Sequence, residues 1–129
     1  KDGTLVAFLR DSNKQHVYRT QSFDGGKNWD TPTPTNLPNP DSAVAATLLG
    51  DKDILLVYNH SNSDRTPLSI ARSQDGGKTF TRLKDLENIA GGYSYPEVIS
   101  AKDGMLHVVY TYDRKSIKHV QFNESWLSQ

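Results

Sequence analysis

The sequence SFDGGKNW, Ser22–Trp29, occurs a second time with small changes as SQDGGKTF, Ser73–Phe80. Each copy follows a β-rich run and precedes another strand-like run, which predicts the tight turn of a β-hairpin. The paired glycines supply the positive φ angle that such a turn needs, and the aspartate can accept hydrogen bonds from backbone N–H groups of the turn. We expect the closing aromatic residues, Trp29 and Phe80, to fold back as buried anchors.

The spacing of the two copies indicates that the chain is built from a repeated unit. They are separated by about fifty residues, which is the length of one four-stranded blade of a β-propeller. No stretch of the sequence has convincing helical periodicity. We therefore predict an all-β fold, a partial β-propeller made of four-stranded antiparallel blades.

The individual strands are predicted from β-rich runs that are bounded by turn-forming residues. Residues 31–40 carry four of the six prolines of the chain. Because proline cannot donate to a β-ladder, we expect an extended connection between blades there, and no central strand. The predicted strands are Thr4–Arg10, Gln15–Ser22, Ser42–Leu49, Ile54–Asn59, Leu68–Ser73, Thr81–Leu86, Pro96–Ser100, Met105–Tyr112 and Ser116–Phe122.

These strands divide the chain into one complete blade, residues 41–90, between two incomplete blades, residues 1–40 and 91–129. Blades bury their faces against neighbouring blades, so fewer than three of them cannot close a ring. Residues 1–3 resemble the turn of a hairpin, so the sequence starts within a β-structure whose first strand is not included. We therefore expect the chain to be the C-terminal half of a longer polypeptide. The alternative is a homodimer whose two copies complete a propeller.

The composition gives no bulk electrostatic reason to expect nucleic acid or an anionic membrane as a partner. The chain has 129 residues, with 15 acidic side chains, 15 basic side chains and no cysteine. A disulfide framework and a thiolate zinc site are therefore excluded, and His60, His107 and His119 lack the spacing of metal ligands. We predict no metal and no other cofactor. No apolar run approaches membrane-spanning length, and the compartment stays open, with a secreted or periplasmic location favoured.

The repeated octapeptide resembles the Asp-box, or BNR repeat, of the sialidase superfamily, which reads Ser-x-Asp-x-Gly-x-Thr-Trp. The first copy has Asn28 in place of the threonine, and the second ends in phenylalanine in place of tryptophan. The resemblance implies a propeller that has six blades when complete. We expect Asp24 and Asp75 to form the turns and to have no catalytic role. The Asp-box positions in this chain are Ser22, Asp24, Gly26, Trp29, Ser73, Asp75, Gly77 and Phe80.

Three further segments resemble functional segments of the same superfamily. The strand that ends in Arg10 resembles the segment carrying the second arginine of a carboxylate-binding triad. Arg65 lies between a strand and the next Asp-box strand, as the third arginine of the triad does. The tripeptide GYS around Tyr93 is similar to the motif of the tyrosine nucleophile, which implies Tyr93 as the catalytic residue. If the resemblance is offset, Tyr95 takes that place.

Neighbouring residues add to this candidate site or compete with it. We expect Asn59 and His60 to line the substrate pocket. Glu97 is either a stand-in for the base or a carboxylate at the rim. A role outside the site is also open for Arg10, because it could form an ordinary surface ion pair with Asp11. Arg65 lies in a polar loop, where a solvated arginine is common.

The resemblance implies an exo-α-sialidase-like glycoside hydrolase that removes a terminal acidic sugar with retention. Sialic acid carries a carboxylate on its anomeric carbon, and the guanidinium groups of Arg10 and Arg65 are suited to hold it in a fixed orientation. A neutral tyrosine nucleophile is not repelled by that carboxylate. The glutamate partner of the tyrosine, the aspartate acid/base and the first arginine would lie before residue 1. We therefore expect the isolated chain to be inactive unless a partner supplies them.

Two other functions are compatible with the same residues. The first is a carbohydrate-binding or scaffold propeller that performs no chemistry, and a pair of arginines with no base in reach would favour it. The second is a polysaccharide lyase that acts on uronic-acid glycans, whose unsaturated product absorbs in the ultraviolet. The predicted partner in each reading is sialic acid or another acidic glycan.

Overall fold

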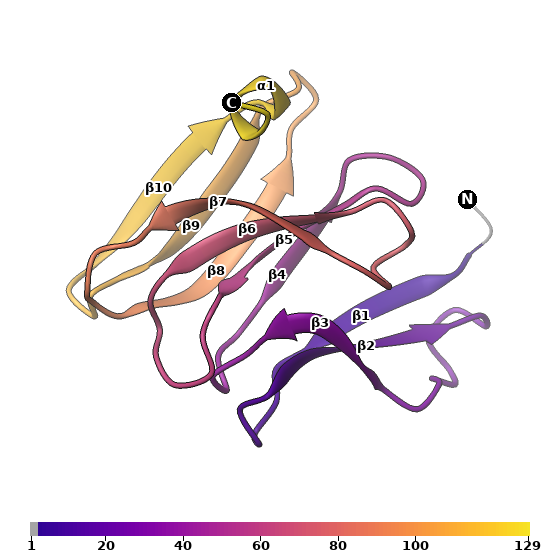
Figure 1. The fold of residues 1–129 in the computed structure, drawn as a ribbon. Coiled ribbons are helices and arrows are strands. Elements are labelled where there is room, and N and C mark those ends of the chain that lie inside the picture. Colours follow the sequence, from indigo (N-terminus) through magenta and orange to yellow (C-terminus); the bar gives the residue numbers. More distant parts are fainter. Residues whose placement is uncertain (1–2) are drawn as a thin grey trace.

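Three antiparallel sheets lie side by side in the computed structural model, which describes residues 3–129 (Figure 1). Strands that follow one another in sequence are neighbours in each sheet. The prediction of an all-β fold with antiparallel blades is confirmed. The sheets contain β1 (Leu5–Leu9), β2 (His16–Ser22) and β3 (Thr33–Pro38); β4 (Ala45–Leu48), β5 (Ile54–Asn59), β6 (Leu68–Ser73) and β7 (Thr81–Glu87); and β8 (Tyr93–Ser100), β9 (Leu106–Tyr112) and β10 (Ser116–Phe122).

The proline-rich segment forms the edge strand β3 of the first sheet, so the prediction of a connection between blades was wrong at this point. Its pairing with β2 is irregular, with His16 opposite Pro38 and Tyr18 opposite Pro34. An edge strand tolerates proline because only one of its sides needs backbone donors. The same prolines would break a central strand, and that part of the prediction agrees with the position of β3.

A short helix, α1 (Glu124–Leu127), follows β10. It begins after Asn123, whose Oδ1 accepts the N–H of Trp126 at 3.1 Å. The sequence did not predict it, because four residues are too few to show helical periodicity. Among the described residues, no helix is long and apolar enough to cross a membrane. The predicted turn at residues 1–3 lies largely outside the described part of the chain.

Both Asp-box segments form the predicted turns, and in each the aspartate binds the backbone. Asp24 Oδ1 accepts the N–H groups of Lys27 at 3.0 Å and Asn28 at 2.9 Å. In the second turn Asp75 Oδ1 accepts two equivalent N–H groups, at 2.9 and 3.0 Å. The serine hydroxyl donates to the aspartate in both copies, at 2.8 and 2.7 Å. All four glycines of the two turns have positive φ angles, as expected.

The two closing aromatic residues differ in burial. Phe80 is 6% exposed and makes an edge contact with Phe8 of β1, with ring centroids 5.6 Å apart. Trp29 is 44% exposed, so the prediction that it would be a buried anchor was wrong. Its indole Nε1 donates to the carbonyl of Gly26 at 3.0 Å, so the ring lies along its own turn.

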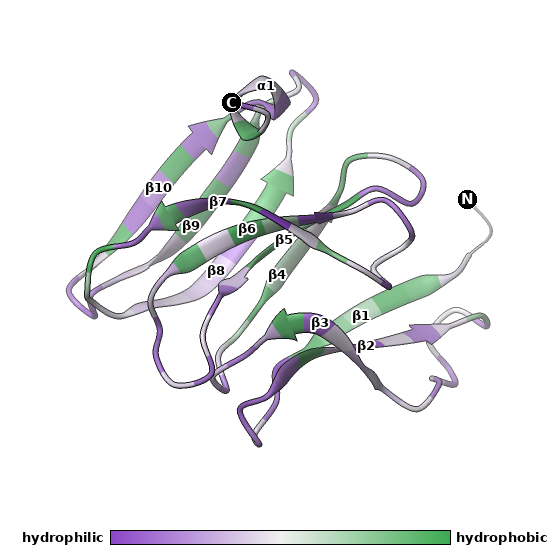
Figure 2. Ribbon diagram, viewed as in Figure 1, coloured by the Kyte–Doolittle hydropathy of each residue, from purple (hydrophilic) through white to green (hydrophobic). Residues whose placement is uncertain are grey.

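The middle sheet is buried on both faces, and its strand β5 separates two hydrophobic cores. Leu55 and Val57 belong to the core shared with the third sheet. Leu56 and Tyr58, which alternate with them, belong to the core shared with the first sheet. Figure 2 shows the apolar residues along β5 and β6 in the centre of the structure. The strand therefore reads as a continuous apolar run and lacks the alternation of a half-exposed strand.

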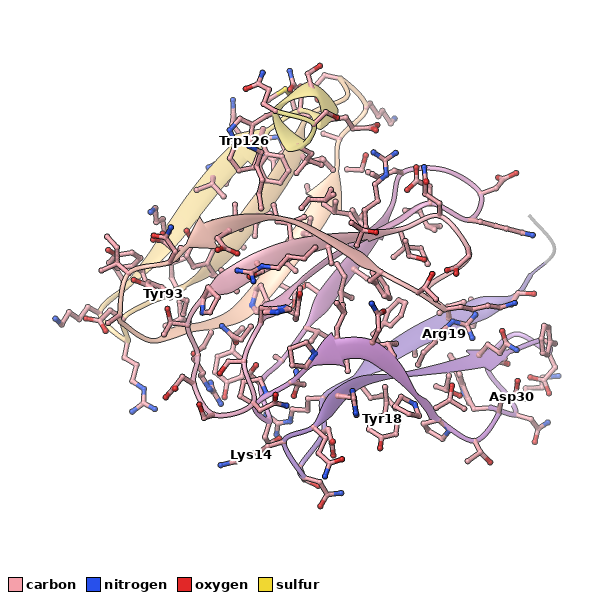
Figure 3. The ribbon with its side chains drawn as sticks, viewed as in Figure 1. Lys14, Tyr18, Arg19, Asp30, Tyr93 and Trp126 are labelled. Carbon is pink, nitrogen blue, oxygen red and sulfur yellow. The ribbon has the colours of Figure 1, made fainter. Side chains whose placement is uncertain are left out.

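Polar contacts fasten the second Asp-box turn to the first sheet. The side-chain amide of Asn36 donates to the carbonyl of Phe80 at 2.8 Å and accepts its N–H at 2.9 Å. Arg19 Nε donates to the carbonyl of Gly76 at 2.9 Å, and Figure 3 shows Arg19 beside this turn. Backbone groups of the turn are thus satisfied by side chains from another sheet, which fixes how the two sheets meet.

We predict that Gly77→Ala destabilises the protein more than Gly76→Ala. Both glycines have positive φ angles, 83° and 78°, which cost an alanine about 1–2 kcal/mol. A Cβ at Gly77 would also lie 2.5 Å from Cζ of Phe8, whereas nothing lies within 4 Å of a Cβ at Gly76. Overpacking at the first site should add about 1–3 kcal/mol to the loss of unfolding free energy. Urea denaturation of both variants measures the difference, and equal losses would contradict the close approach of the turn to β1.

We also predict that Asp24 makes stability depend on acid pH. Hydrogen bonds from the backbone N–H and the side chain of Asn28 lower the pKa of Asp24 to about 2, below its unfolded value of about 3.9. Its contribution is therefore complete above a pH of about 4 and is lost as the pH falls towards 2. The unfolding free energies of the native chain and of Asp24→Asn should differ near neutral pH and converge on acidification. A difference that does not change with pH would contradict this role.

Candidate functional site

Arg10 follows the last residue of β1, where the backbone is fixed by its neighbour Asp11. The buried Asp11 carboxylate accepts the N–H groups of Asn13 at 2.9 Å and Gln15 at 3.0 Å. The first of these bonds is the main cause that lowers the pKa of Asp11. Arg10 pairs instead with Asp41, with its Nε 3.3 Å from Oδ1. The surface pair of Arg10 with Asp11 that the sequence left open is therefore not formed.

A fully buried asparagine, Asn39, binds the backbone next to Arg10 and next to Asp41 and so keeps these two residues close together. Asn39 Oδ1 accepts the N–H groups of Asp11 and Ser42, each at 3.2 Å, and its Nδ2 donates to the carbonyl of Ser42 at 3.0 Å. These bonds tie the end of β1 to the segment after β3. Sequence reasoning missed both Asn39 and Asp41, although the run PNPD is typical of a tight turn and could have indicated them.

Arg65 lies in the loop between β5 and β6 and reaches the start of the third sheet. Its Cζ lies 5.3 Å from the ring centroid of Tyr95, a cation–π contact. The backbone carbonyl of Arg65 accepts the N–H of Tyr93 at 2.9 Å. The hydroxyl of the next residue, Thr66, donates to the carbonyl of Ile89 at 3.1 Å. The loop is thus attached to the chain that leads into β8.

The two tyrosines at the start of β8 differ from the expected arrangement, in which Tyr93 faces the site. Tyr93 is 2% exposed, belongs to the core, and donates its hydroxyl proton to the carbonyl of Ile89 at 3.1 Å (Figure 3). Tyr95 is 58% exposed and lies against Arg65. The structure thus places Tyr95, the offset alternative, beside Arg65 and encloses Tyr93 in the core; which of the two acts as a nucleophile stays a prediction.

A β-bulge explains this difference. The register of β8 with β9 shifts between Ser94 and Glu97, and Tyr95 has a φ angle of 52°. In an undistorted strand, residues two apart point to the same face, but a bulge turns one of them away. Pro96 was the signal in the sequence, because a proline cannot donate to the ladder and is found in strands mainly at edges and bulges.

The environments of the two phenols shift their pKa values in opposite directions. Hydrogen bonding and charge from Arg65 lower the pKa of Tyr95, and Arg10 adds a smaller effect of the same kind. Burial raises the pKa of Tyr93. The phenol at the arginines is thus the one that loses its proton more readily, which is the property that a tyrosine nucleophile requires.

The remaining predicted residues lie at different depths. Asn59 is fully buried and donates from Nδ2 to the carbonyls of Tyr93 at 3.1 Å and Pro67 at 3.3 Å, and its contact with a substrate stays a prediction. His60 Nδ1 lies 2.5 Å from the Tyr58 hydroxyl, and burial is the main cause that lowers the pKa of this imidazole. Its contact with a substrate stays a prediction, as does the role of the exposed Glu97.

No group of three or more metal-ligating side chains occurs within residues 3–129. Of the histidines considered above, His107 and His119 face each other on β9 and β10, with Nδ1 and Nε2 3.0 Å apart and the rings stacked. The residues that the structure does bring together are Arg10 from the first sheet, Arg65 from the second and Tyr95 from the third.

We predict that Tyr95 titrates at a lower pH than an ordinary tyrosine and that Tyr93 titrates at a higher pH. Arg65→Ala removes the nearest positive charge and should raise the pKa of Tyr95 towards about 10, with little effect on Tyr93. NMR spectra of a chain with ring-labelled tyrosine measure both values, and the variants Tyr95→Phe and Tyr93→Phe assign the signals. A Tyr95 pKa that does not respond to Arg65→Ala would contradict the arrangement of the site.

Comparison with known proteins places the chain in a family. The model of the BNR repeat-like domain family matches residues 1–108. No protein in a search of curated sequences matches significantly. Similar solved structures include the intramolecular trans-sialidase from Ruminococcus gnavus, with 22% identity, a TM-score of 0.77 and coverage of 99% of this chain and 32% of that one.

Two other structures extend the comparison. The leech intramolecular trans-sialidase has 19% identity and a TM-score of 0.76, with 98% of this chain and 22% of that one covered. The NanB sialidase from Streptococcus pneumoniae has 15% identity and a TM-score of 0.78, with 97% and 22% covered. The chain therefore spans about a third or less of the length of these structures, and the likeness concerns the fold. The chain belongs to the BNR repeat-like domain family, and its three sheets have the fold of blades of a sialidase-superfamily β-propeller.

Proposed function

We propose that this chain contributes the carboxylate-binding arginines and the nucleophile of a sialidase-like glycosidase that removes a terminal acidic sugar. The observation that carries the proposal is the convergence of Arg10 and Arg65, from two different sheets, on the phenol of Tyr95. Their chemistry suits an anionic ligand, because two guanidinium groups close together attract a carboxylate strongly.

The arginines would bind the carboxylate of the sugar. Asp41 occupies Nε of Arg10, so the two terminal nitrogens of this guanidinium are the ones that would meet the ligand. Arg65 would approach the ligand from the second sheet. Two relatives support this choice of ligand: the Ruminococcus gnavus enzyme was solved with oseltamivir carboxylate, and the leech enzyme with 2,7-anhydro-Neu5Ac.

Tyr95 would be the nucleophile. Its phenolic oxygen would form a bond to the anomeric carbon as the bond from that carbon to the leaving oxygen breaks, and water would then release the sugar with retention. A neutral phenol is not repelled by the substrate carboxylate, and the lowered pKa of Tyr95 reduces the demand on a base. The proposal assigns the acid for the leaving group and the base for the phenol to a longer polypeptide or to a second copy.

Ligand binding tests the carboxylate clamp in the chain itself. We expect oseltamivir carboxylate to bind and its uncharged ethyl ester to bind much more weakly. Arg10→Ala and Arg65→Ala should each lower the affinity about tenfold or more, because a charge-assisted hydrogen bond contributes about 1.5–3 kcal/mol. Lys102→Ala removes one positive charge from the exposed turn between β8 and β9 and should change the affinity little. Ligand-observed NMR measures all four proteins, and an equal effect of the three substitutions would contradict the clamp.

Release of a fluorophore from a sialic acid glycoside tests the chemistry. In an assembly that shows activity, with its mass measured by light scattering, Tyr95→Phe should abolish release and Tyr93→Phe should retain most of it. The opposite result would identify Tyr93 as the nucleophile. Binding that depends on the arginines without any release would favour a carbohydrate-binding propeller, and an unsaturated product that absorbs in the ultraviolet would favour a lyase.

A further inference from the structure

We propose that Asn59 is a positioning residue, which holds the loop that carries Arg65 and the strand that carries Tyr95 at a fixed separation through one buried side-chain amide. The inference deepens the proposed function and rests on the site described there. It replaces the direct contact with substrate that the sequence suggested for Asn59.

The amide of Asn59 connects two segments that are far apart in the sequence. Its Nδ2 donates to the carbonyl of Tyr93 at 3.1 Å and to the carbonyl of Pro67 at 3.3 Å. Tyr93 lies two residues before Tyr95, and Pro67 lies two residues after Arg65. The N–H of Tyr93 also donates to the carbonyl of Arg65 at 2.9 Å. Both backbone polar groups of Tyr93 are therefore bound, one directly by the Arg65 loop and the other through Asn59.

This connection matters because the β-ladder does not hold Tyr95. Pairing of β8 with β9 stops after Ser94 and resumes at Glu97, and the exposed Tyr95 between them has a φ angle of 52°. Such a conformation in a bulky residue persists only where its surroundings enforce it. The bonds at Tyr93 are among the last backbone restraints before the bulge, and in this proposal they help to set the direction in which Tyr95 leaves the strand.

The choice of asparagine agrees with this role. The Asn59 amide group supplies two N–H donors from one short side chain, whereas aspartate has none and serine has one. Among the described residues, Asn59 Oδ1 is a buried oxygen without a hydrogen-bond partner. An unpaired buried acceptor costs stability. Asparagine is thus a poor choice for packing alone, and its two donors explain why the position is polar.

The test measures the tyrosine titration in the whole chain. Asn59→Leu keeps the approximate size of the side chain and removes both donors. We expect it to raise the pKa of Tyr95 by at least half of the shift that Arg65→Ala causes, because the ring moves away from the guanidinium. Asn59→Ser keeps one donor and should give a smaller shift; it also serves as the test variant if Asn59→Leu does not fold.

A matched control separates positioning from loss of stability. Thr35 is buried in the first sheet and donates to the carbonyl of Val17 at 2.7 Å, so Thr35→Val also removes a buried hydrogen bond. This variant should lose stability and leave the Tyr95 titration unchanged. A folded Asn59→Leu protein with the native Tyr95 pKa would overturn the inference, provided that Arg65→Ala shifts it. If Arg65→Ala has no effect either, the proposed site itself is wrong.

Discussion

The arrangement depends on the burial of the middle sheet from both sides. Every residue of β5 is buried, and its alternate side chains fill two different cores. Full burial of one large apolar side chain contributes about 1.5–3 kcal/mol, so this strand holds the first and third sheets against the second. The residues of the candidate site come from all three sheets, Arg10 and Arg65 from loops and Tyr95 from strand β8. The packing of the first and third sheets against β5 brings these three parts of the chain to one place.

Much of the fold could be predicted because local chemistry determines it. The Asp-box turns need only glycines that adopt positive φ and an aspartate that binds backbone N–H groups, and both features are visible in the sequence. Burial that depends on a distant partner was harder to predict. Phe80 is buried because Phe8 from another sheet meets it, whereas Trp29 lies on its own turn. Nothing within either octapeptide distinguishes these two outcomes.

The candidate site was predicted in part, and the limits have a physical origin. Arg10 and Arg65 follow strand ends, which sequence patterns locate well. The choice between Tyr93 and Tyr95 depended on a bulge that changes which face a side chain takes, and periodicity assumes that no bulge is present. Asp41, which pairs with Arg10, comes from a turn after a different strand. The turn itself has a local pattern, PNPD, but the pairing of Asp41 with Arg10 is created by the tertiary fold.

The second Asp-box turn contacts the first sheet at one end of the strands, and the candidate site lies at the other end. The Asp-box begins at the last residue of β2 and of β6, whereas the loops that carry Arg10 and Arg65 precede the first residue of these strands. The packing of Phe80 on Phe8 therefore restrains the first two sheets at the end far from Arg10 and Arg65. The Asp-box segment thus has two structural effects: it closes a turn within its own sheet, and it takes part in the packing of that sheet against its neighbour.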